Sequence, residues 1–243
     1  MRKLLITVLL IIPIMIQAQD DSYTMFETVL LSPDGKDPAK LSAAMKAHNT
    51  KFHNTDPHTA AVWAISTGPN AGKMVWAMGP LKYADLDTRP QGDAHDSDWA
   101  KVMAHITGVG TIEYWKRDDK LSNVVGDPTP MLYVRYWEVS NKYDFLVDGL
   151  LKQISATIKA MDGENPWAVW DNEMRQGNLG RHIATVSNMK NWAEMDDAPQ
   201  FQATFKKVHG EDSWIPFLRS MNIAFTNSWD EVWTLAPEMG GAE

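Results

Sequence analysis

The sequence contains an internal duplication, and this feature restricts the possible folds more than any other. The segments that recur are Ala61-Val62-Trp63 as Ala168-Val169-Trp170, Asp98-Trp99 as Ser213-Trp214, and Ile112-Glu113-Tyr114-Trp115 as Asp230-Glu231-Val232-Trp233. The offset between matching positions grows from 107 to 118 residues, as loop insertions in the second copy would produce. We therefore expect one structural unit at residues 19–117 and a second at 131–243, joined by a linker at 118–130.

Each copy has the pattern of strand, helix, strand, strand, helix, strand. Aromatic and β-branched residues indicate the strands, Asp37-Pro38 indicates a helix start, and the glycine-containing segment 68–72 indicates a hairpin turn. The strands expected in the first copy are 23–31, 62–66, 73–78 and 111–116. Its first helix is expected to begin at Asp37-Pro38 and to end at Asp56-Pro57, and its second helix is expected at 97–106. The strands expected in the second copy are 132–139, 166–171, 181–187 and 228–235, with helices at 143–161 and 214–221.

The order βαββαβ is that of a ferredoxin-like unit, which has helices on one face of its sheet. The other face must be covered, and the second copy supplies a matching surface. In this order and duplication, residues 23–236 resemble the dimeric α/β-barrel superfamily. Its members include antibiotic-biosynthesis-type monooxygenases, EthD-like, stress-responsive A/B-barrel and NIPSNAP proteins, and haem-handling chlorite-dismutase-like proteins. The resemblance implies an α+β fold in which two tandem ferredoxin-like units pack sheet to sheet as one intramolecular barrel.

The first 18 residues have the pattern of a signal peptide. Arg2 and Lys3 precede an uncharged apolar stretch from Leu4 to Ile16, and Ala18 offers a small residue for cleavage. The stretch is shorter than the ~20 residues that a spanning helix needs. We therefore expect export from a bacterial cytoplasm, to the periplasm or beyond, without a stable membrane anchor after cleavage.

Charge and cysteine content exclude several kinds of partner and site. The formal net charge of −8 disfavours binding to nucleic acid, because phosphate backbones are repelled. The chain has no cysteine, so disulfides, thiolate metal sites and cysteine nucleophiles are excluded. With 11 tryptophans and 14 methionines, the chain has ample material for an apolar core or for the wall of a ligand pocket.

Four glutamates are candidate ligand-binding residues. Glu113 and Glu231 occupy the same place in the two copies, each on the same strand face as the tryptophan two residues later. Glu27 and Glu138 lie on the opening strands, which neighbour the closing strands in a ferredoxin-like sheet. The carboxylates could thus approach each other near the barrel with Arg135 as a counter-charge, and burial would raise their pKa values. The alternative is that they lie at strand ends or in exposed grooves.

Tryptophans without a counterpart in the other copy are better pocket candidates than the recurring ones, because binding sites break repeat symmetry. Trp76 and Trp137, both on strands, are the two we select. The recurring tryptophans at 63/170, 99/214 and 115/233 are expected to pack the core.

The histidines do not predict a metal site by their spacing. His48, His53 and His58 are five residues apart and would lie on different faces of a helix, whereas zinc ligands on a helix prefer separations of three or four. Within the resemblance, a haem-binding member would need an axial ligand on a helix beside the barrel, and His105 is the first candidate, followed by His209. The sequence thus leaves the cofactor unknown, with haem as one option and without evidence for a nucleotide or a metal.

Three functions remain open, and the sequence does not decide whether the protein is an enzyme. The first is binding of a small apolar or aromatic molecule, in the barrel or between sheet and helices. The second, implied by the resemblance, is a cofactor-independent monooxygenase or a haem-dependent enzyme. The third is a protein-interaction module, in which the fused units form a monomeric pseudo-dimer.

Overall fold

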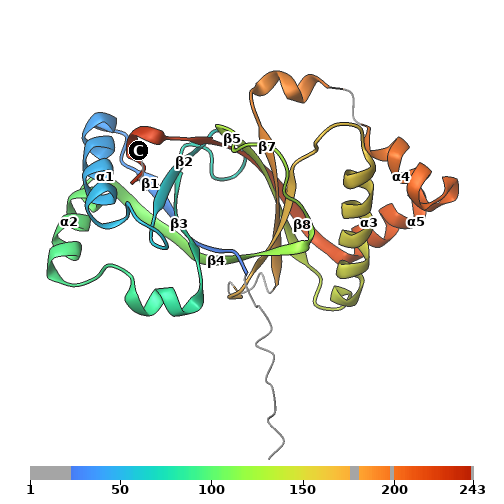
Figure 1. Cartoon of the computed structure of the whole chain (residues 1–243), viewed down its shortest axis with the longest axis horizontal. Helices are drawn as coiled ribbons and strands as arrows, with labels where there is room; N and C mark the ends of the chain where they lie inside the picture. The colour runs from blue at the N-terminus through green and yellow to red at the C-terminus, as the bar shows by residue number, and fades with distance from the viewer. Residues whose placement is uncertain (1–22, 176–180, 198–199, 242–243) are drawn as a thin grey trace, which may run out of the picture.

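The computed structural model describes residues 23–175, 181–197 and 200–241. The predicted signal peptide lies outside these residues. Eight strands form a closed barrel, with two helices against one side and three against the other (Figure 1). None of the helices in the described ranges is long and apolar enough to cross a membrane.

The first unit runs from residue 25 to residue 123. Its strands are β1 (Met25–Pro33), β2 (Ala60–Ile65), β3 (Met74–Leu81) and β4 (Ile106–Asn123), and its helices are α1 (Pro38–Phe52) and α2 (Asp93–Met103). The second unit has strands β5 (Met131–Val139), β6 (Trp167–Asn172), β7 (His182–Met189) and β8 (Phe225–Leu235). Its helices are α3 (Val147–Ala160), α4 (Phe201–His209) and α5 (Trp214–Ala224).

The strand order confirms the expected pair of ferredoxin-like units. Around the barrel the strands run β1-β3-β2-β8-β5-β7-β6-β4, so that each unit contributes four consecutive strands. Antiparallel pairing of β2 with β8 and of β4 with β6 joins the units at two seams. The barrel therefore closes without free sheet edges between the two copies.

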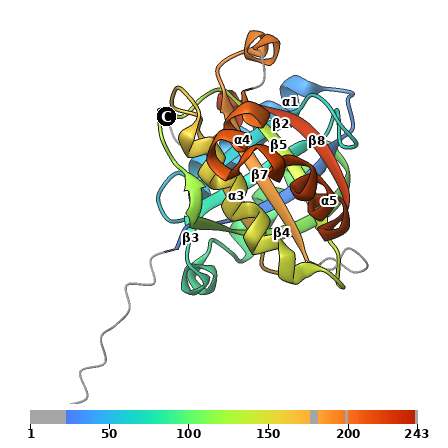
Figure 2. The same ribbon diagram turned by 90° about the vertical axis from the view of Figure 1, so that its right-hand side faces the viewer.

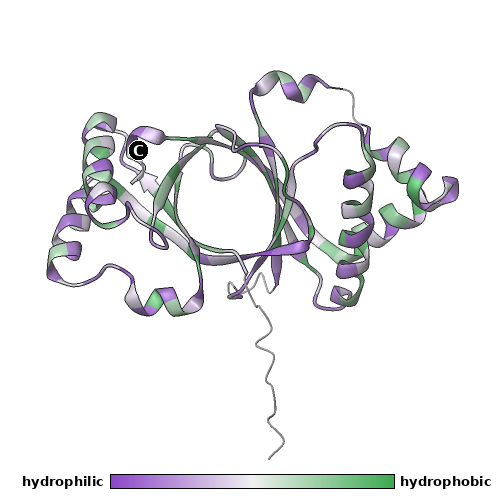
Figure 3. Ribbon diagram, viewed as in Figure 1, coloured by the Kyte–Doolittle hydropathy of each residue, from purple (hydrophilic) through white to green (hydrophobic). Residues whose placement is uncertain are grey.

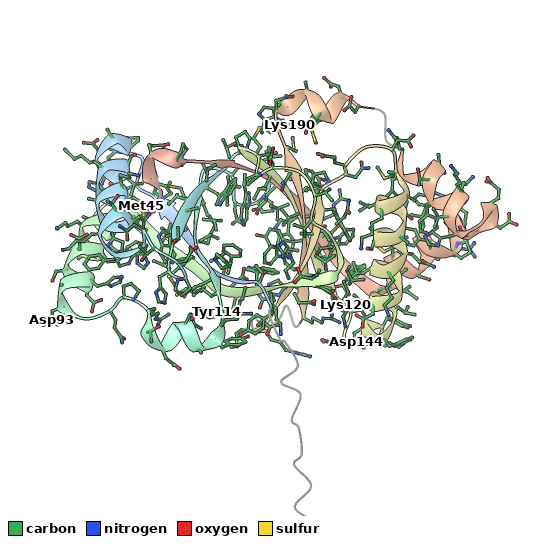
Figure 4. All side chains as sticks on the ribbon, in the orientation of Figure 1. Met45, Asp93, Tyr114, Lys120, Asp144 and Lys190 are labelled. Atoms are coloured by element: carbon green, nitrogen blue, oxygen red, sulfur yellow. The ribbon has the colours of Figure 1, made fainter. Side chains whose placement is uncertain are left out.

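Alternating side chains of each strand point to the helices or into the barrel, because successive residues face opposite sides of a sheet. On β1, Met25, Glu27, Val29 and Leu31 are buried towards α1 and α2. Figure 4 shows Met45 of α1 turned towards the sheet, and Figure 2 shows α3, α4 and α5 lying side by side over the second unit. The ribbons of the helices carry both polar and apolar residues along their length, as expected for helices with one buried side (Figure 3).

Three elements differ from the sequence-based expectation. Strand β4 continues to Asn123, into the segment expected to be a linker, because its second half pairs with β6. Helix α2 begins at Asp93 rather than at 97, after Gly92 with φ of 92°. The second unit has α4 and α5 where one helix was expected. Helix α4 was missed because Gln200 before it is not an N-capping residue and makes no side-chain cap hydrogen bond.

Candidate functional site

The barrel interior contains an apolar cavity of about 510 Å³. Phe26, Trp63 and Trp170 form part of its wall, and Val124 and Val125 of the segment between the units lie at its edge. Arg117 is the one charged side chain among the described lining residues; it pairs with Asp119. The cavity has the surface of an apolar binding site but few groups that could carry out a reaction.

Two glutamates inside the barrel have hydrogen-bond partners. Glu231, 1% exposed, accepts hydrogen bonds from the indole of Trp233 at 2.8 Å and from the amide of Asn70 at 2.7 Å. Glu113 accepts from the indole of Trp115 at 3.2 Å and contacts Nε2 of His182 at 3.2 Å. The expected shared face of each glutamate and its tryptophan is confirmed. Because the pattern occurs in both units, we interpret it as part of the scaffold.

The four glutamates are not brought together. Tyr114 of β4 is opposite Glu27 of β1, and Glu113 is one residue further along; therefore Glu27 faces the helices while Glu113 faces the barrel interior. In the second unit, Glu138 lies at the end of β5 and accepts from Asn227 at 3.3 Å, far along the strand from Glu231. The expected approach of paired carboxylates is therefore wrong.

Two further sequence candidates have other contacts. Arg135 does not face the glutamates: it makes a two-bond ion pair with Asp230, at 2.5 and 2.7 Å, on the side of β5 opposite to the buried Val134. Trp137 donates to Oγ1 of Thr185 at 3.2 Å and packs near the helices of the second unit. Neither residue lines one of the two cavities described here.

A second cavity, of about 410 Å³, lies in the first unit between the sheet and the helices α1 and α2. We call it the histidine pocket. Its polar lining includes Glu27, His48, His53, Arg89 and His95, together with Gln91 and Asp96. This lining brings together residues from β1, α1, the turn after α1, the segment before α2, and α2 itself.

Three imidazoles converge in this lining. The ring nitrogens of His48, His53 and His95 lie within 4.8 Å of one another, and Nε2 of His53 is 3.4 Å from Nε2 of His95. His48 belongs to the last turns of α1, whereas His53 follows the helix as its C-cap with φ of −134°. Because the helix ends between them, the two rings reach the same pocket despite their spacing of five.

The expected arrangement of the histidines therefore needs correction. That expectation assumed one continuous helix and took His58 as the third residue. In the structure the third residue is His95 from α2, and His58 contributes only its backbone carbonyl, 3.2 Å from Nδ1 of His53. The ring of His58 points elsewhere and donates to the carbonyl of Asp85 at 2.8 Å.

Each imidazole of the cluster is held through Nδ1. His48 Nδ1 lies 3.3 Å from the carboxylate of Asp98, and His95 Nδ1 lies 3.1 Å from the carboxylate of Asp96. A hydrogen bond from Lys101 at 2.6 Å lowers the pKa of Asp98, which keeps this carboxylate ionised. Burial lowers the pKa of His53 to about 4, and burial with the charge of His95 lowers the pKa of His48. At neutral pH, His48 and His53 are uncharged.

A carboxyl group and a guanidinium are also part of the polar lining. Glu27 is 6% exposed, and burial raises its pKa, although Arg89, with Nη1 at 3.5 Å from Oε2, opposes this shift. The Arg89 side chain is itself 46% exposed, so its charge is partly screened by solvent. A buried carboxyl group with a raised pKa beside neutral imidazoles is typical of a site for proton transfer.

Aromatic and thioether side chains also line the pocket. Trp76, predicted from its lack of a repeat partner, donates to Oδ1 of Asn49 at 2.9 Å and packs 5.0 Å from the ring of His53. Trp99 packs 4.9 Å from the ring of His48, and Met78 and Met103 add to the wall. Trp99 was expected to be core because it recurs, so sequence reasoning missed it as a pocket residue.

The two units differ at this place. In the second unit, the space between sheet and helices contains a packed cluster that includes Phe205, 0% exposed, and Phe217, 6% exposed, with rings 4.4 Å apart. In the first unit, the same layer holds the histidines. The space between the sheet and the helices is therefore filled by apolar side chains in the second unit and contains a polar pocket in the first unit.

The described residues do not fit haem. His105 lies in the turn after α2 and does not line either cavity, and His209 in the second unit contacts the carbonyl of Gln153 at 3.1 Å. A haem iron accepts axial protein ligands on the two faces of its macrocycle. The pocket histidines instead converge towards one another, with two Nε2 atoms only 3.4 Å apart.

Comparison with known proteins supports the fold but does not identify a function. No family model matches the sequence, and no curated protein matches it. Among solved structures, the chain is similar to an anthrone oxidase-like protein (13% identity, 89% of this chain and 92% of that chain, TM-score 0.58). It is also similar to a proposed monooxygenase from Fusobacterium nucleatum subsp. nucleatum (10% identity, 88% and 93%, TM-score 0.52) and to a mutant chlorite dismutase from Candidatus Nitrospira defluvii (9% identity, 90% and 94%, TM-score 0.54). The chain therefore has the dimeric α+β-barrel fold.

Proposed function

We propose that the protein is an oxidative enzyme that acts on a small aromatic molecule in the histidine pocket. One observation carries this proposal: a single cavity of about 410 Å³ is lined both by aromatic and thioether side chains and by ionisable side chains. Ligand pockets commonly have volumes of ~300–1,000 Å³. The pocket therefore suits a substrate with an apolar ring system and one ionisable hydroxyl group.

The aromatic and the ionisable side chains have different roles in this proposal. The rings of Trp76 and Trp99, with centroids 6.0 Å apart, orient the ring system of the substrate. Glu27 accepts a hydrogen bond or a proton from the hydroxyl group, which makes the ring electron-rich. Arg89 stabilises the resulting negative charge. The oxidative reaction class is suggested by the anthrone oxidase-like protein and the proposed monooxygenase that share the fold.

The test uses binding and oxygen consumption. Purified protein is titrated with anthrone, 1-naphthol and naphthalene by isothermal titration calorimetry, and oxygen uptake is followed with an electrode. We expect the hydroxylated or enolisable compounds to bind more tightly than naphthalene and at least one of them to be oxidised. If none binds, or if naphthalene binds equally well, the proposed substrate class is wrong.

Glu27→Gln tests the polar lining with little change of shape. General acid–base groups contribute roughly 100- to 10,000-fold to rate, so we expect a loss of oxygen uptake in that range. The control is Glu138→Gln, the same substitution at a glutamate on the opening strand of the second unit, where the side chain does not line the pocket. Equal effects of the two substitutions would contradict the assignment of the site.

We also propose that the enzyme acts after export, as the N-terminal sequence predicts, and as a monomer. N-terminal sequencing of protein recovered from its native host should begin near Gln19, and light scattering should give the mass of one chain. An intact Met1 terminus would contradict export, and a dimer mass would contradict the monomer.

A further inference from the structure

The three pocket histidines present a problem of proton placement. Nδ1 of each ring faces a group that can only accept: the carboxylate of Asp98 for His48, a backbone carbonyl for His53, and the carboxylate of Asp96 for His95. Each Nδ1 must therefore carry the proton. In a neutral imidazole only one nitrogen is protonated, so every Nε2 then carries a lone pair.

Two of these nitrogens lie close together, and the third has no partner within the described ranges. Nε2 of His53 and Nε2 of His95 are 3.4 Å apart, and two lone pairs at this distance repel unless a positive group lies between them. Nε2 of His48, in a residue that is 0% exposed, has no hydrogen-bond partner among the described residues. A buried polar atom without a partner carries a cost of about 1–3 kcal/mol, so it requires an explanation.

One added proton would provide a hydrogen bond for only two of the three Nε2 atoms. A second proton on His95 would bridge to His53, but it would leave Nε2 of His48 without a partner. A cation that accepts three lone pairs at once satisfies all three rings.

The spacing of His53 and His95 and the surroundings of all three rings match a metal centre. Ring nitrogens that are up to 4.8 Å apart are drawn closer together when one ion binds them. Two nitrogens at ~2.0–2.1 Å from a tetrahedral ion lie about 3.3–3.4 Å apart, which is the distance between the Nε2 atoms of His53 and His95. Metal-binding histidines almost always donate their other N–H to a carboxylate or a backbone carbonyl, as all three do here. Ring packing of Trp99 on His48 and of Trp76 on His53 restricts the imidazoles further.

We propose that His48, His53 and His95 bind one divalent first-row transition-metal ion through their Nε2 atoms. Imidazole ligands suit Zn²⁺, Fe²⁺, Cu²⁺ and Ni²⁺, and three protein ligands leave a coordination position for water or substrate. All three histidines line the pocket, so this position is open to it. The binding of the metal does not depend on the substrate class; only the role of a substrate oxygen as the fourth ligand rests on the proposed function.

The experiment measures Co²⁺ binding to the untagged, chelator-treated mature chain without any substrate. We expect one equivalent of Co²⁺ to bind with visible absorption bands of a four- or five-coordinate site, and Zn²⁺ to displace it. His53→Gln and His95→Gln should each weaken binding by at least about 100-fold, because a lost ligand costs more than a lost second-shell partner. Asp98→Asn, which removes the acceptor of His48 Nδ1, should weaken binding by about 10- to 100-fold.

His105→Gln is the matched control, because His105 lies in the same unit but does not line the pocket. This variant should bind Co²⁺ with the same affinity as the wild type. His95 is in the first turn of α2 and not fully buried, so His95→Gln should fold, as circular dichroism would establish. Absence of stoichiometric Co²⁺ binding, or affinity unchanged in both His53→Gln and His95→Gln, would overturn the proposal in favour of a proton shared by His53 and His95. If Co²⁺ binds but the aromatic compounds neither bind nor are oxidised, the metal site is retained and the proposed function is rejected. If the aromatic compounds are bound and oxidised but Co²⁺ does not bind, the proposed function is retained and the metal site is rejected.

Discussion

The packing of the two units where β2 meets β8 can be tested by substituting two glycines of one turn. Gly68 and Gly72 both lie between β2 and β3 and both have positive φ, 81° and 85°. A methyl group at position 68 would lie 2.2 Å from the backbone oxygen of Asp230 and 2.9 Å from Cγ of Glu231, both on β8 of the other unit. A methyl group at position 72 would have no heavy atom within 4 Å among its described neighbours.

The two substitutions to alanine therefore share backbone strain and differ in packing. Left-handed backbone costs an alanine about 1–2 kcal/mol at either position. At position 68 the turn must also move away from β8, which adds about 1–3 kcal/mol for overpacking. This movement weakens the hydrogen bonds from Ser66 N to Val232 O and from Val232 N to Thr67 Oγ1, both 2.8 Å, worth about 1 kcal/mol each. We expect Gly68→Ala to lower the free energy of unfolding by about 3–5 kcal/mol and Gly72→Ala by about 1–2 kcal/mol.

Urea unfolding at equilibrium, followed by far-ultraviolet circular dichroism, measures both losses under the same conditions. The difference between the variants, about 2–3 kcal/mol, reports the packing of the first unit's turn on the second unit's strand. Equal losses, within about 0.5 kcal/mol, would refute the reasoning, because strain alone would then account for both substitutions.

Three other substitutions test the ion pair, the barrel interior and the helix layer. The Arg135 hydrogen bonds lower the pKa of Asp230 from its usual 3.8, so the stabilisation by this pair is fully present above that pH and declines as the pH falls towards the lowered pKa. Asp230→Asn should therefore cost about 0.5–1 kcal/mol at pH 7 for this partly exposed pair and progressively less below pH 3.8. A loss independent of pH would exclude the ion pair as its cause. Glu231→Gln should cost about 1–3 kcal/mol in urea unfolding, because the new amide group faces a donor from Asn70 or Trp233, and a neutral result would contradict the assigned hydrogen bonds. Phe205→Ala should lower the free energy of unfolding by about 3–5 kcal/mol in the same assay. Phe145→Ala, which changes a side chain that is 73% exposed, should lower it by less than about 0.5 kcal/mol. Similar losses for the two variants would contradict the packed layer.

Much of the fold could be predicted because the signals are local and occur twice. Alternating strands, the N-cap at Asp37 and the turn at 68–72 depend on nearby residues, and the duplication turned two similar patterns into one architecture. Helix α4 was missed because its amphipathic pattern begins without a capping residue. The length of β4 was missed because its second half is stabilised by β6, a partner that is distant in sequence.

The site was predicted only in part. Trp76 was selected correctly as a pocket residue, because a difference between two copies is visible in the sequence. Glu27 was also selected, but it was expected to lie beside Glu113. The two face opposite sides of the sheet, because Glu27 is opposite Tyr114 and a difference of one residue in register places a side chain on the other face.

By itself, the sequence determined that two copies of a βαββαβ unit would pack into one barrel, because hydrophobic periodicity and turn residues act over a few positions. Only the tertiary structure decided where chemistry can occur. His53 and His95 are 42 residues apart, and they meet because α1 ends at Phe52 and α2 packs beside it. Spacing along a chain describes neighbours within one helix, whereas a site between two helices depends on how each helix ends and on which of its faces packs against the sheet.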